Sequence, residues 1–333
     1  MTGRIIHGGG IAAAAGLYGG EPADWLDLST GLNPNPPKLP EIPPSVWHRL
    51  PDDDLVMKAR EAARDYYRSG PILPLPAPGT QSLIQLLPSL MSDVNRPVAI
   101  VSPTYGEYAR VFRHAGLHVH SASTLEDVTD DCALAVVVNP NNPDGRGDGT
   151  ESLVRLYNRL SATNGVLVVD EAFADTDPDI SLAALAADMP RLLIFRSIGK
   201  FFGLAGARIG FAIASAECLL RLERGLGPWA VSGPALYLAE KLLSQDPIPL
   251  RNQIEGRKSA QLKVLERARL SVIGGTSLFS LVLDERAEEI HRHLCRHQIL
   301  VRKFDYEPNW LRFGLAPDEA GDERLFRALT EFA

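Results

Sequence analysis

The chain has 333 residues, and a typical domain size of about 150 residues predicts two domains. Hydrophobic residues make up 45% of the chain and charged residues 23%, which is ordinary soluble usage and excludes a disordered protein. With 34 basic and 41 acidic residues the net charge is −7, which disfavours general binding to nucleic acid or to anionic lipid.

The cysteines and the apolar runs bear on the compartment. Three cysteines lie far apart without a CxxC pair, so we expect no disulfide framework. No apolar run approaches the ~20 residues that span a bilayer, and the first 20 residues lack the apolar core of a signal peptide. We therefore expect a cytoplasmic protein with neither a membrane nor a nucleic-acid partner.

In chain order, a proline-rich arm precedes an alternating pattern. Residues 29–51 hold seven prolines, which disfavours regular helix and predicts an extended arm. Helical spacing of apolar residues then predicts a helix over 53–68. Strands are expected at 72–76, 97–102, 117–121, 133–138, 166–169, 192–196 and 209–214, with helices at 81–91, 107–115 and 152–162. This alternation predicts an α/β fold with a mainly parallel sheet.

The pattern changes after about residue 220. Helices are expected at 234–243, 254–268, 287–297 and 322–332, and strands at 277–283, 299–302 and 310–314. This order predicts a smaller α+β domain. We therefore divide the chain into an N-terminal arm (1–45) that packs on the small domain and the active site, a large domain (46–220) and a small domain (221–333).

We expect the site residues to follow the predicted strands, because ligands bind beyond the carboxyl ends of the strands in an open parallel sheet. The segments at these positions are Gly79-Thr80-Gln81, Pro103-Thr104-Tyr105, Asn139 to Gly145, Asp170 to Phe173 and Ser197 to Lys200. Taken singly, each has an ordinary structural explanation as a turn, a cap or a packing residue. Because all of them follow strands of one sheet, we expect their polar groups to lie together at one edge of that sheet.

Lys200 lies among apolar and glycine residues, which predicts a desolvated amine that can form a Schiff base. Ser197 and Arg208 flank it and can hold an anion nearby. Asp170 ends a buried strand, so its charge needs a partner, which a protonated pyridine nitrogen would provide. The backbone N–H groups that follow Gly79 open a helix and suit a phosphate.

This ordered set resembles the fold type I pyridoxal-phosphate (PLP) enzymes, in the aminotransferase class I/II branch. The resemblance covers nearly the whole chain and rests on Pro103-Thr104-Tyr105, Asn141-Asn142-Pro143, Asp170-Glu171-Ala172-Phe173 and the block of Ser197, Lys200 and Arg208. It implies an aspartate-aminotransferase-like large domain, the cofactor pyridoxal 5'-phosphate, and a homodimer with active sites at the interface.

The resemblance also implies a role for each residue. Lys200 would carry the cofactor as a Schiff base and shuttle protons, Asp170 would pair with the ring nitrogen, and Tyr105 would stack on the ring. Asn142 would bond the phenolic oxygen, and Phe173 stands where many aminotransferases have a tyrosine. The residues expected at the cofactor phosphate are Gly79, Thr80, Gln81, Ser197 and Arg208.

Further motifs narrow the resemblance to the threonine-phosphate decarboxylases, a cobalamin-pathway subgroup. The motifs are His7-Gly8-Gly9, the run from Asp27 to Asn33-Pro34, the phenylalanine at position 173, and Ile299 to Arg302. The subgroup implies decarboxylation of L-threonine O-3-phosphate to (R)-1-aminopropan-2-ol O-2-phosphate. The substrate-binding residues that it implies are His7, Asn33, Arg302 and Arg312. Arg312 matches the family's carboxylate-binding arginine, and the subgroup implies that His7, Arg302 and Arg312 meet the substrate phosphate.

Two other functions stay open. The first is a PLP-dependent aminotransferase acting on histidinol phosphate or a related amine, because the choice of bond broken depends on fine placement of the substrate. The second is a non-catalytic protein of the same fold, which the joint presence of Lys200, Asp170 and Arg208 disfavours.

The sequence Arg49-Leu50-Pro51 lacks the tyrosine with which related enzymes reach the neighbouring subunit's cofactor phosphate.

Two further patterns resemble binding motifs. The residues His291, His293, Cys295 and His297 lack sensible metal-ligand spacing, so we expect a solvated helix face and no metal. The glycines at 203, 206 and 210 do not match Gly-x-Gly-x-x-Gly, which argues against a Rossmann nucleotide site.

Overall fold

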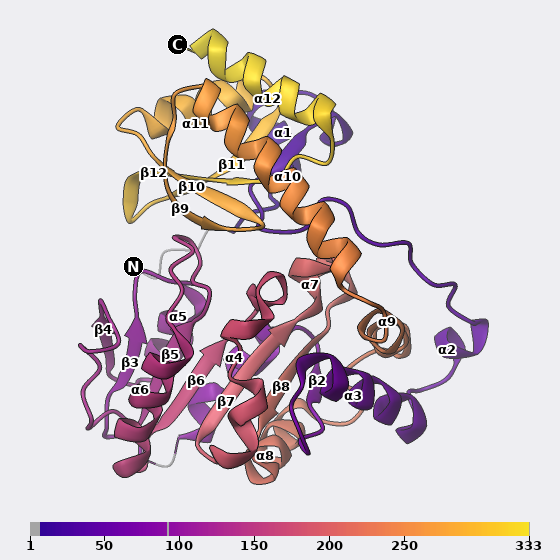
Figure 1. The fold of residues 1–333 in the computed structure, drawn as a ribbon, viewed down its shortest axis with the longest axis vertical. Coiled ribbons are helices and arrows are strands. Elements are labelled where there is room, and N and C mark those ends of the chain that lie inside the picture. The colour runs from indigo at the N-terminus through magenta and orange to yellow at the C-terminus, as the bar shows by residue number, and fades with distance from the viewer. Residues whose placement is uncertain (1–6, 92, 333) are drawn as a thin grey trace. The chain divides into compact units, whose positions relative to one another are not determined.

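The computed structural model describes residues 7–91 and 93–332. Its contacts divide the chain into two compact units (Figure 1), each described here by itself. The large unit comprises Lys38–Asn142 and Gly147–Asp246. The small unit comprises the N-terminal segment up to Pro37, Pro143–Arg146 and the chain from Pro247 onward.

The large unit is built on one mixed sheet. Its strands lie in the order β2 (Leu75–Ala77), β8 (Gly210–Ala214), β7 (Leu192–Ser197), β6 (Val166–Asp170), β5 (Leu134–Val138), β3 (Val98–Val101) and β4 (Val119–Ala122). Neighbours from β7 to β4 pair in parallel, whereas β8 is antiparallel to both β2 and β7. The predicted mainly parallel α/β sheet is therefore confirmed.

Helices cover this sheet and supply its core. The core on one face joins Leu83 of α4 (Thr80–Leu90), Phe112 of α5 (Glu107–His114) and Leu222 of α8 (Ala216–Leu226) to Phe195 and other strand residues. Another helix, α6 (Thr150–Ala162), packs on β6. The remaining helices are α2 (Pro44–His48), α3 (Asp53–Tyr67), α7 (Ile198–Phe201) and α9 (Gly233–Leu243). Short 3₁₀ turns are η2 (Ala174–Thr176), η3 (Pro178–Ile180), η4 (Ala183–Asp188) and η5 (Ala205–Ala207).

The predicted boundaries at 45/46 and 220/221 both fall inside the large unit. The structure extends this unit to Asp246 because α8 packs on α4 and α9 packs on α3. Within the prolines of 29–51 the structure also forms the short helix α2, which begins at Pro44. Proline is tolerated in a first helical turn, where its missing N–H has no intrahelical partner.

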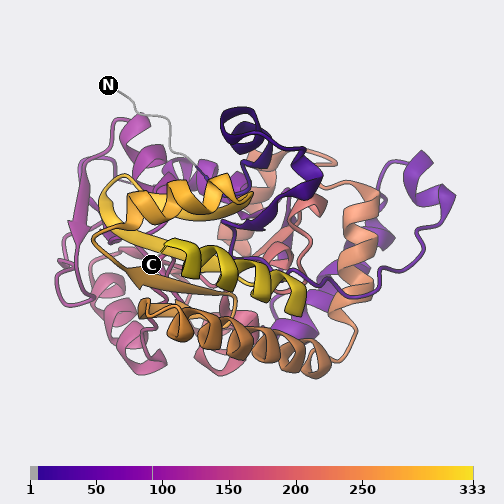
Figure 2. The same cartoon turned by 90° about the horizontal axis from the view of Figure 1, so that it is seen from above.

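The small unit has its own sheet, in the order β1 (Leu26–Leu28), β11 (Ile299–Phe304), β12 (Glu307–Gly314), β10 (Phe279–Leu283) and β9 (Ser271–Thr276). β1 pairs in parallel with β11, and the other pairs are antiparallel. Figure 2 shows the helices α10 (Ile248–Arg267), α11 (Ala287–Arg296) and α12 (Glu319–Phe332) side by side on this unit.

The N-terminal segment is part of the small unit. It forms α1 (Ile11–Tyr18), η1 (Pro22–Asp24) and β1, none of which the sequence pattern predicted. Ala14 and Trp25 pack on Cys295 of α11, so tertiary contacts hold this segment. Among the residues that the structure describes, no helix has the length and apolar character to cross a lipid bilayer.

Candidate active site

The carboxyl ends of β3, β5, β6 and β7 lead into the segments that hold the candidate residues of the large unit. Tyr105 follows β3, Asn142 follows β5, and Asp170 is the last residue of β6. Ser197 ends β7 and Lys200 lies in α7, the helix that follows. The parallel pairing of these strands brings segments that are distant in sequence to one edge of the sheet.

Asp170 is buried, with 5% of its surface exposed, and both of its carboxylate oxygens accept hydrogen bonds. Oδ2 accepts from the Tyr108 hydroxyl at 2.8 Å, and Oδ1 accepts from the backbone N–H of Ala172 at 3.0 Å. Burial raises the pKa of Asp170, while these two bonds and the charge of Lys200 oppose the rise. Asp170 forms no ion pair with any residue that the structure describes.

Lys200 is half-buried beside Phe173, with its Nζ 5.4 Å from the centroid of the phenyl ring. Phe173 is itself buried and presents no hydroxyl group. The ammonium group therefore has an apolar neighbour on one side and the Asp170 carboxylate within electrostatic reach. The desolvated amine expected from the sequence stays a prediction for this half-buried side chain.

The start of α4 forms a tight cradle with Arg208. Gly79 precedes the helix with a φ of 72°, and a Cβ there would lie 2.7 Å from Nη2 of Arg208. A Cβ on Gly210 would lie 3.1 Å from the backbone nitrogen of Thr80. Because Gly210 pairs with Ser197 across the sheet, the turn, the serine and the arginine converge. A helix N-terminus beside a guanidinium group suits a phosphate.

Gln81 connects this cradle to Tyr105. The Tyr105 hydroxyl donates to Oε1 of Gln81 at 3.1 Å, and Nε2 of Gln81 donates to Oε2 of Glu107 at 3.1 Å. Glu107 is buried and also accepts from Arg110 at 3.0 Å. Because a carboxylate can only accept hydrogen bonds, Glu107 holds the Nε2 side of the Gln81 amide. The Oε1 side is then the acceptor for the Tyr105 hydroxyl. The Gln81 side chain thus links Tyr105 to the first turn of α4.

The asparagine-rich loop after β5 is held by its own side chains. Nδ2 of Asn139 donates to the Asp148 carbonyl at 3.1 Å, and the Asp148 N–H donates back to Oδ1 of Asn139 at 2.8 Å. Asn141 donates to the Pro103 carbonyl at 2.8 Å. These bonds fix the loop that carries the half-buried Asn142.

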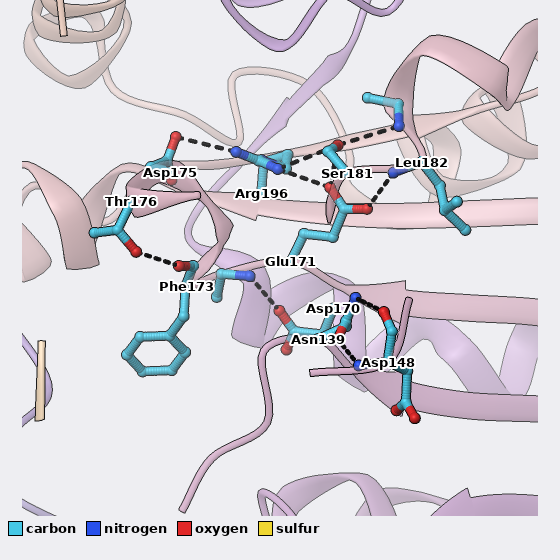
Figure 3. A network of polar contacts seen from close by, with 12 residues as sticks. Asn139, Asp148, Asp170, Glu171, Phe173, Asp175, Thr176, Ser181, Leu182 and Arg196 are labelled. Atoms are coloured by element: carbon cyan, nitrogen blue, oxygen red, sulfur yellow. Dashed lines mark hydrogen bonds and ion pairs between the residues drawn. The ribbon is translucent and has the colours of Figure 1, made fainter. Parts of the chain in front are cut away.

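A buried ion cluster joins the ends of β6 and β7 (Figure 3), and it was not predicted from the sequence. Nη1 of Arg196 donates to Glu171 at 2.7 Å, and Nη2 donates to Asp175 at 3.1 Å. All three residues are at most 2% exposed, and the guanidinium carbon lies 4.5 Å from the centre of the Tyr67 ring. The available signal was the arginine at the end of the otherwise apolar run 192–196, where a charge needs partners.

Arg312 is central to the candidate substrate residues of the small unit. It is buried, and its Nη2 donates to the Ser29 carbonyl at 2.9 Å. Arg302 is its cross-strand partner in the β11–β12 pair. Burial, and then the charge of Arg302, lower the pKa of Arg312 to about 10. Two like charges on neighbouring strands repel each other, and an anion between them would relieve that repulsion.

His7 lies in a segment that packs against the same residue, Ser29. The Gly9 N–H donates to the Ser29 hydroxyl at 2.7 Å, and a Cβ on Gly8 would clash with the Ser29 carbonyl. This close approach therefore requires glycine at position 8, whereas Gly9 has a φ of 84°, which favours glycine for its backbone conformation. Asn33 is buried, and its Oδ1 accepts from the Asn35 N–H at 2.9 Å in a local turn.

The histidine and cysteine residues of α11 are not all solvated, and that expectation is wrong for two of them. His291 and Cys295 are buried, and the Cys295 sulfur lies 3.8 Å from Nδ1 of His291. Burial lowers the pKa of His291 to about 4. Within the described residues, no group of three or more potential ligands could hold a metal ion.

The residues of the large unit fit pyridoxal 5'-phosphate. That cofactor needs an amine, a carboxylate for its ring nitrogen and a seat for its phosphate. Lys200 supplies the amine, and Asp170 supplies a buried carboxylate held by hydrogen bonds from Tyr108 and the Ala172 backbone. The space that Gly79 leaves open beside Arg208 supplies the seat.

The fold and this site define a member of the aminotransferase class I and II family, and the chain belongs to that family: its family model matches residues 26–329. The chain is 52% identical over 330 residues to a threonine-phosphate decarboxylase from Sinorhizobium sp., covering 99% of each chain. It is 42% identical over 332 residues to a threonine-phosphate decarboxylase from Pseudomonas aeruginosa, covering 98% of each.

Among solved structures, the fold is similar to that of a histidinol-phosphate aminotransferase from Sinorhizobium meliloti in complex with pyridoxal-5'-phosphate. The TM-score is 0.80 at 18% sequence identity, covering 100% of this chain and 96% of the other. At this identity the likeness shows a shared fold and does not distinguish the reactions.

Proposed function

We propose that this chain is a PLP-dependent carboxy-lyase that converts L-threonine O-3-phosphate to (R)-1-aminopropan-2-ol O-2-phosphate in cobalamin biosynthesis. The observation that carries the proposal is the similarity, at 52% and 42% identity over nearly the whole chain, to two threonine-phosphate decarboxylases. The pair of arginines in the small unit agrees with a phosphorylated, carboxylate-bearing substrate.

The net reaction breaks the bond between Cα and the carboxylate, releases CO2, and adds a proton at Cα. Pyridoxal 5'-phosphate, when bound, supplies a conjugated ring that withdraws the electron pair left on Cα. Asp170 would hold the proton on the ring nitrogen, because a buried carboxylate without an ion-pair partner favours a cation beside it. Nζ of Lys200 would carry the proton that is delivered to Cα.

The remaining residues would orient the two ligands. Tyr105 would stack on the cofactor ring, and Asn142 would donate to its phenolic oxygen, where Phe173 contributes no second hydrogen bond. The cofactor phosphate would bind to Gly79, Thr80, Gln81, Ser197 and Arg208. The substrate anions would bind to His7, Asn33, Arg302 and Arg312. These assignments rest on the family resemblance, and the geometry within each unit supports the proposal.

The decisive experiment follows both possible products from one substrate. The purified protein, loaded with pyridoxal 5'-phosphate, is incubated with carboxyl-labelled threonine phosphate, with and without a 2-oxo acid as amino acceptor. We expect labelled CO2 and aminopropanol phosphate, independent of the acceptor. Keto-acid formation that requires the acceptor, without CO2, would instead show transamination and favour the alternative, an aminotransferase acting on histidinol phosphate or a related amine.

We also propose a cytoplasmic homodimer. In the large unit, the large apolar side chains that are more than 60% accessible include Trp47, Leu50 and Trp229. Isolated apolar residues are common on surfaces, but aromatic residues are enriched at protein interfaces. Light scattering after size-exclusion chromatography should give twice the 36.2 kDa chain mass. A monomer mass with full activity would contradict this proposal.

A further inference from the structure

Tyr108 contacts two residues to which the proposed function assigns a cofactor role. It lies in α5 and is fully buried. Its hydroxyl donates to Oδ2 of Asp170 at 2.8 Å. Its ring meets the ring of Tyr105 edge-on, with centroids 6.3 Å apart and an angle of 82° between the planes. One side chain thus touches both the carboxylate and the stacking ring.

The direction of the hydrogen bond follows from chemistry. Burial raises the pKa of the Tyr108 phenol well above its usual value, so the hydroxyl keeps its proton. An ionised carboxylate can only accept, so Tyr108 donates and Asp170 accepts. The second oxygen of Asp170 accepts from the Ala172 backbone. With a donor on each oxygen, the plane of the carboxylate is fixed, and with it the direction of the remaining lone pairs.

The same bond also affects the charge on Asp170. Burial and the neighbouring charge of Glu171 both favour the protonated acid. Among the groups that oppose them, the Tyr108 hydroxyl has the largest effect, ahead of the Ala172 N–H and Lys200. Without that hydroxyl, Asp170 would shift toward the neutral acid, which attracts a protonated ring nitrogen less strongly.

We propose that Tyr108 is a positioning residue of the cofactor site, which orients the Asp170 carboxylate through its hydroxyl and holds the Tyr105 ring through its own ring. The proposal rests on the proposed function in one respect, the use of pyridoxal 5'-phosphate. It does not depend on which reaction the loaded enzyme performs.

Tyr108→Phe separates the two contacts, because it removes the hydroxyl and retains the aromatic ring. A hydrogen bond to a charged group contributes enough that its loss weakens binding by roughly tenfold or more. We therefore expect the dissociation constant for pyridoxal 5'-phosphate to rise about tenfold, measured by titrating the cofactor-free protein and following absorbance. The pH at which the cofactor's visible band changes should also move. Tyr157→Phe in α6, a buried tyrosine outside the site, should change neither quantity.

Tyr108→Leu removes both contacts. We expect the circular dichroism of the bound cofactor to fall further than in Tyr108→Phe, because the Tyr105 ring loses its edge-on neighbour. A double-mutant cycle with Asp170→Asn then tests the route of the effect. If Tyr108 acts through Asp170, Tyr108→Phe should weaken cofactor binding less in the Asp170→Asn variant than in the wild-type protein.

Each part can fail separately. Unchanged cofactor affinity and an unchanged pH response in Tyr108→Phe would overturn the role of the hydroxyl. Equal dichroism in the Phe and Leu variants would overturn the role of the ring, and fully additive effects in the cycle would overturn the action through Asp170. A wild-type protein that binds pyridoxal 5'-phosphate but releases no CO2 would refute the proposed reaction and leave this test intact.

Discussion

Replacing Arg302 with alanine is the sharpest test of how the substrate phosphate is bound. Arg302 and Arg312 are cross-strand partners, and the charge of Arg302 contributes to the lowered pKa of Arg312. In the free protein the two cations therefore repel each other, and a bound phosphate between them would be attracted by both. A charge-assisted hydrogen bond to such an anion contributes about 1.5–3 kcal/mol.

That magnitude sets the expected loss. Arg302→Ala should reduce kcat/KM for threonine phosphate by about one to two decades. The lower end is favoured, since the substitution also removes the repulsion with Arg312. Plain threonine, which lacks the phosphate, should be affected much less. Arg302→Lys should recover part of the loss, because it keeps the charge but not the guanidinium geometry.

The assay measures CO2 release from both substrates in the wild type and the variants. Arg327→Ala serves as the matched control, because Arg327 lies in the same unit, is 72% exposed and pairs with Glu323 on its own helix. If Arg302→Ala and Arg327→Ala turned over threonine phosphate equally well, the anion-binding role of Arg302 would be refuted.

Three other predictions concern different parts of the chain. Lys200→Ala should abolish CO2 release, and borohydride reduction of the loaded wild type should fix the cofactor on Lys200; a label on Lys258 would contradict the assignment. Arg196→Met leaves two buried carboxylates without their cation and should lower the free energy of unfolding, measured in urea, by about 3–5 kcal/mol. The control Arg327→Met, at an exposed ion pair, should lower it by under ~1 kcal/mol. Equal losses in the two variants would refute this account. Because burial lowers the pKa of His291 to about 4, the unfolded chain binds the extra proton between pH 6.5 and 4, so stability falls as pH falls through that window. His291→Leu should remove roughly 3 kcal/mol of that fall, and identical pH profiles would show that His291 does not titrate this way.

The local sequence predicted the order of most elements of the large unit. The helix expected at 53–68 is observed as Asp53–Tyr67, and the strand expected at 166–169 as Val166–Asp170. These elements have strong periodicity or continuous apolar runs, and such signals are local. β9 was missed, because Ser271–Thr276 is exposed to partly buried and includes two glycines, so the run has no clear apolar pattern.

Part of the candidate site could be predicted because its residues follow strands. Asp170, Lys200 and the turn at Gly79 were predicted, because a strand end or a glycine before a helix can be recognised in the sequence. Tyr105 was predicted, but Tyr108, three residues later, was not. Both are tyrosines in one short segment, and only the packing of α5 shows that Tyr108 is the one bonded to Asp170.

The sequence by itself determined the alternation that gives an α/β sheet and the residues that end its strands, because these depend on local periodicity and residue type. Only the tertiary structure decided that β8 runs antiparallel and that Arg196 meets Glu171 and Asp175. It also decided that Arg302 stands beside Arg312. Strand direction, ion partners and cross-strand neighbours depend on which distant segments pack together, and that packing is a property of the whole fold and not of any local run of residues.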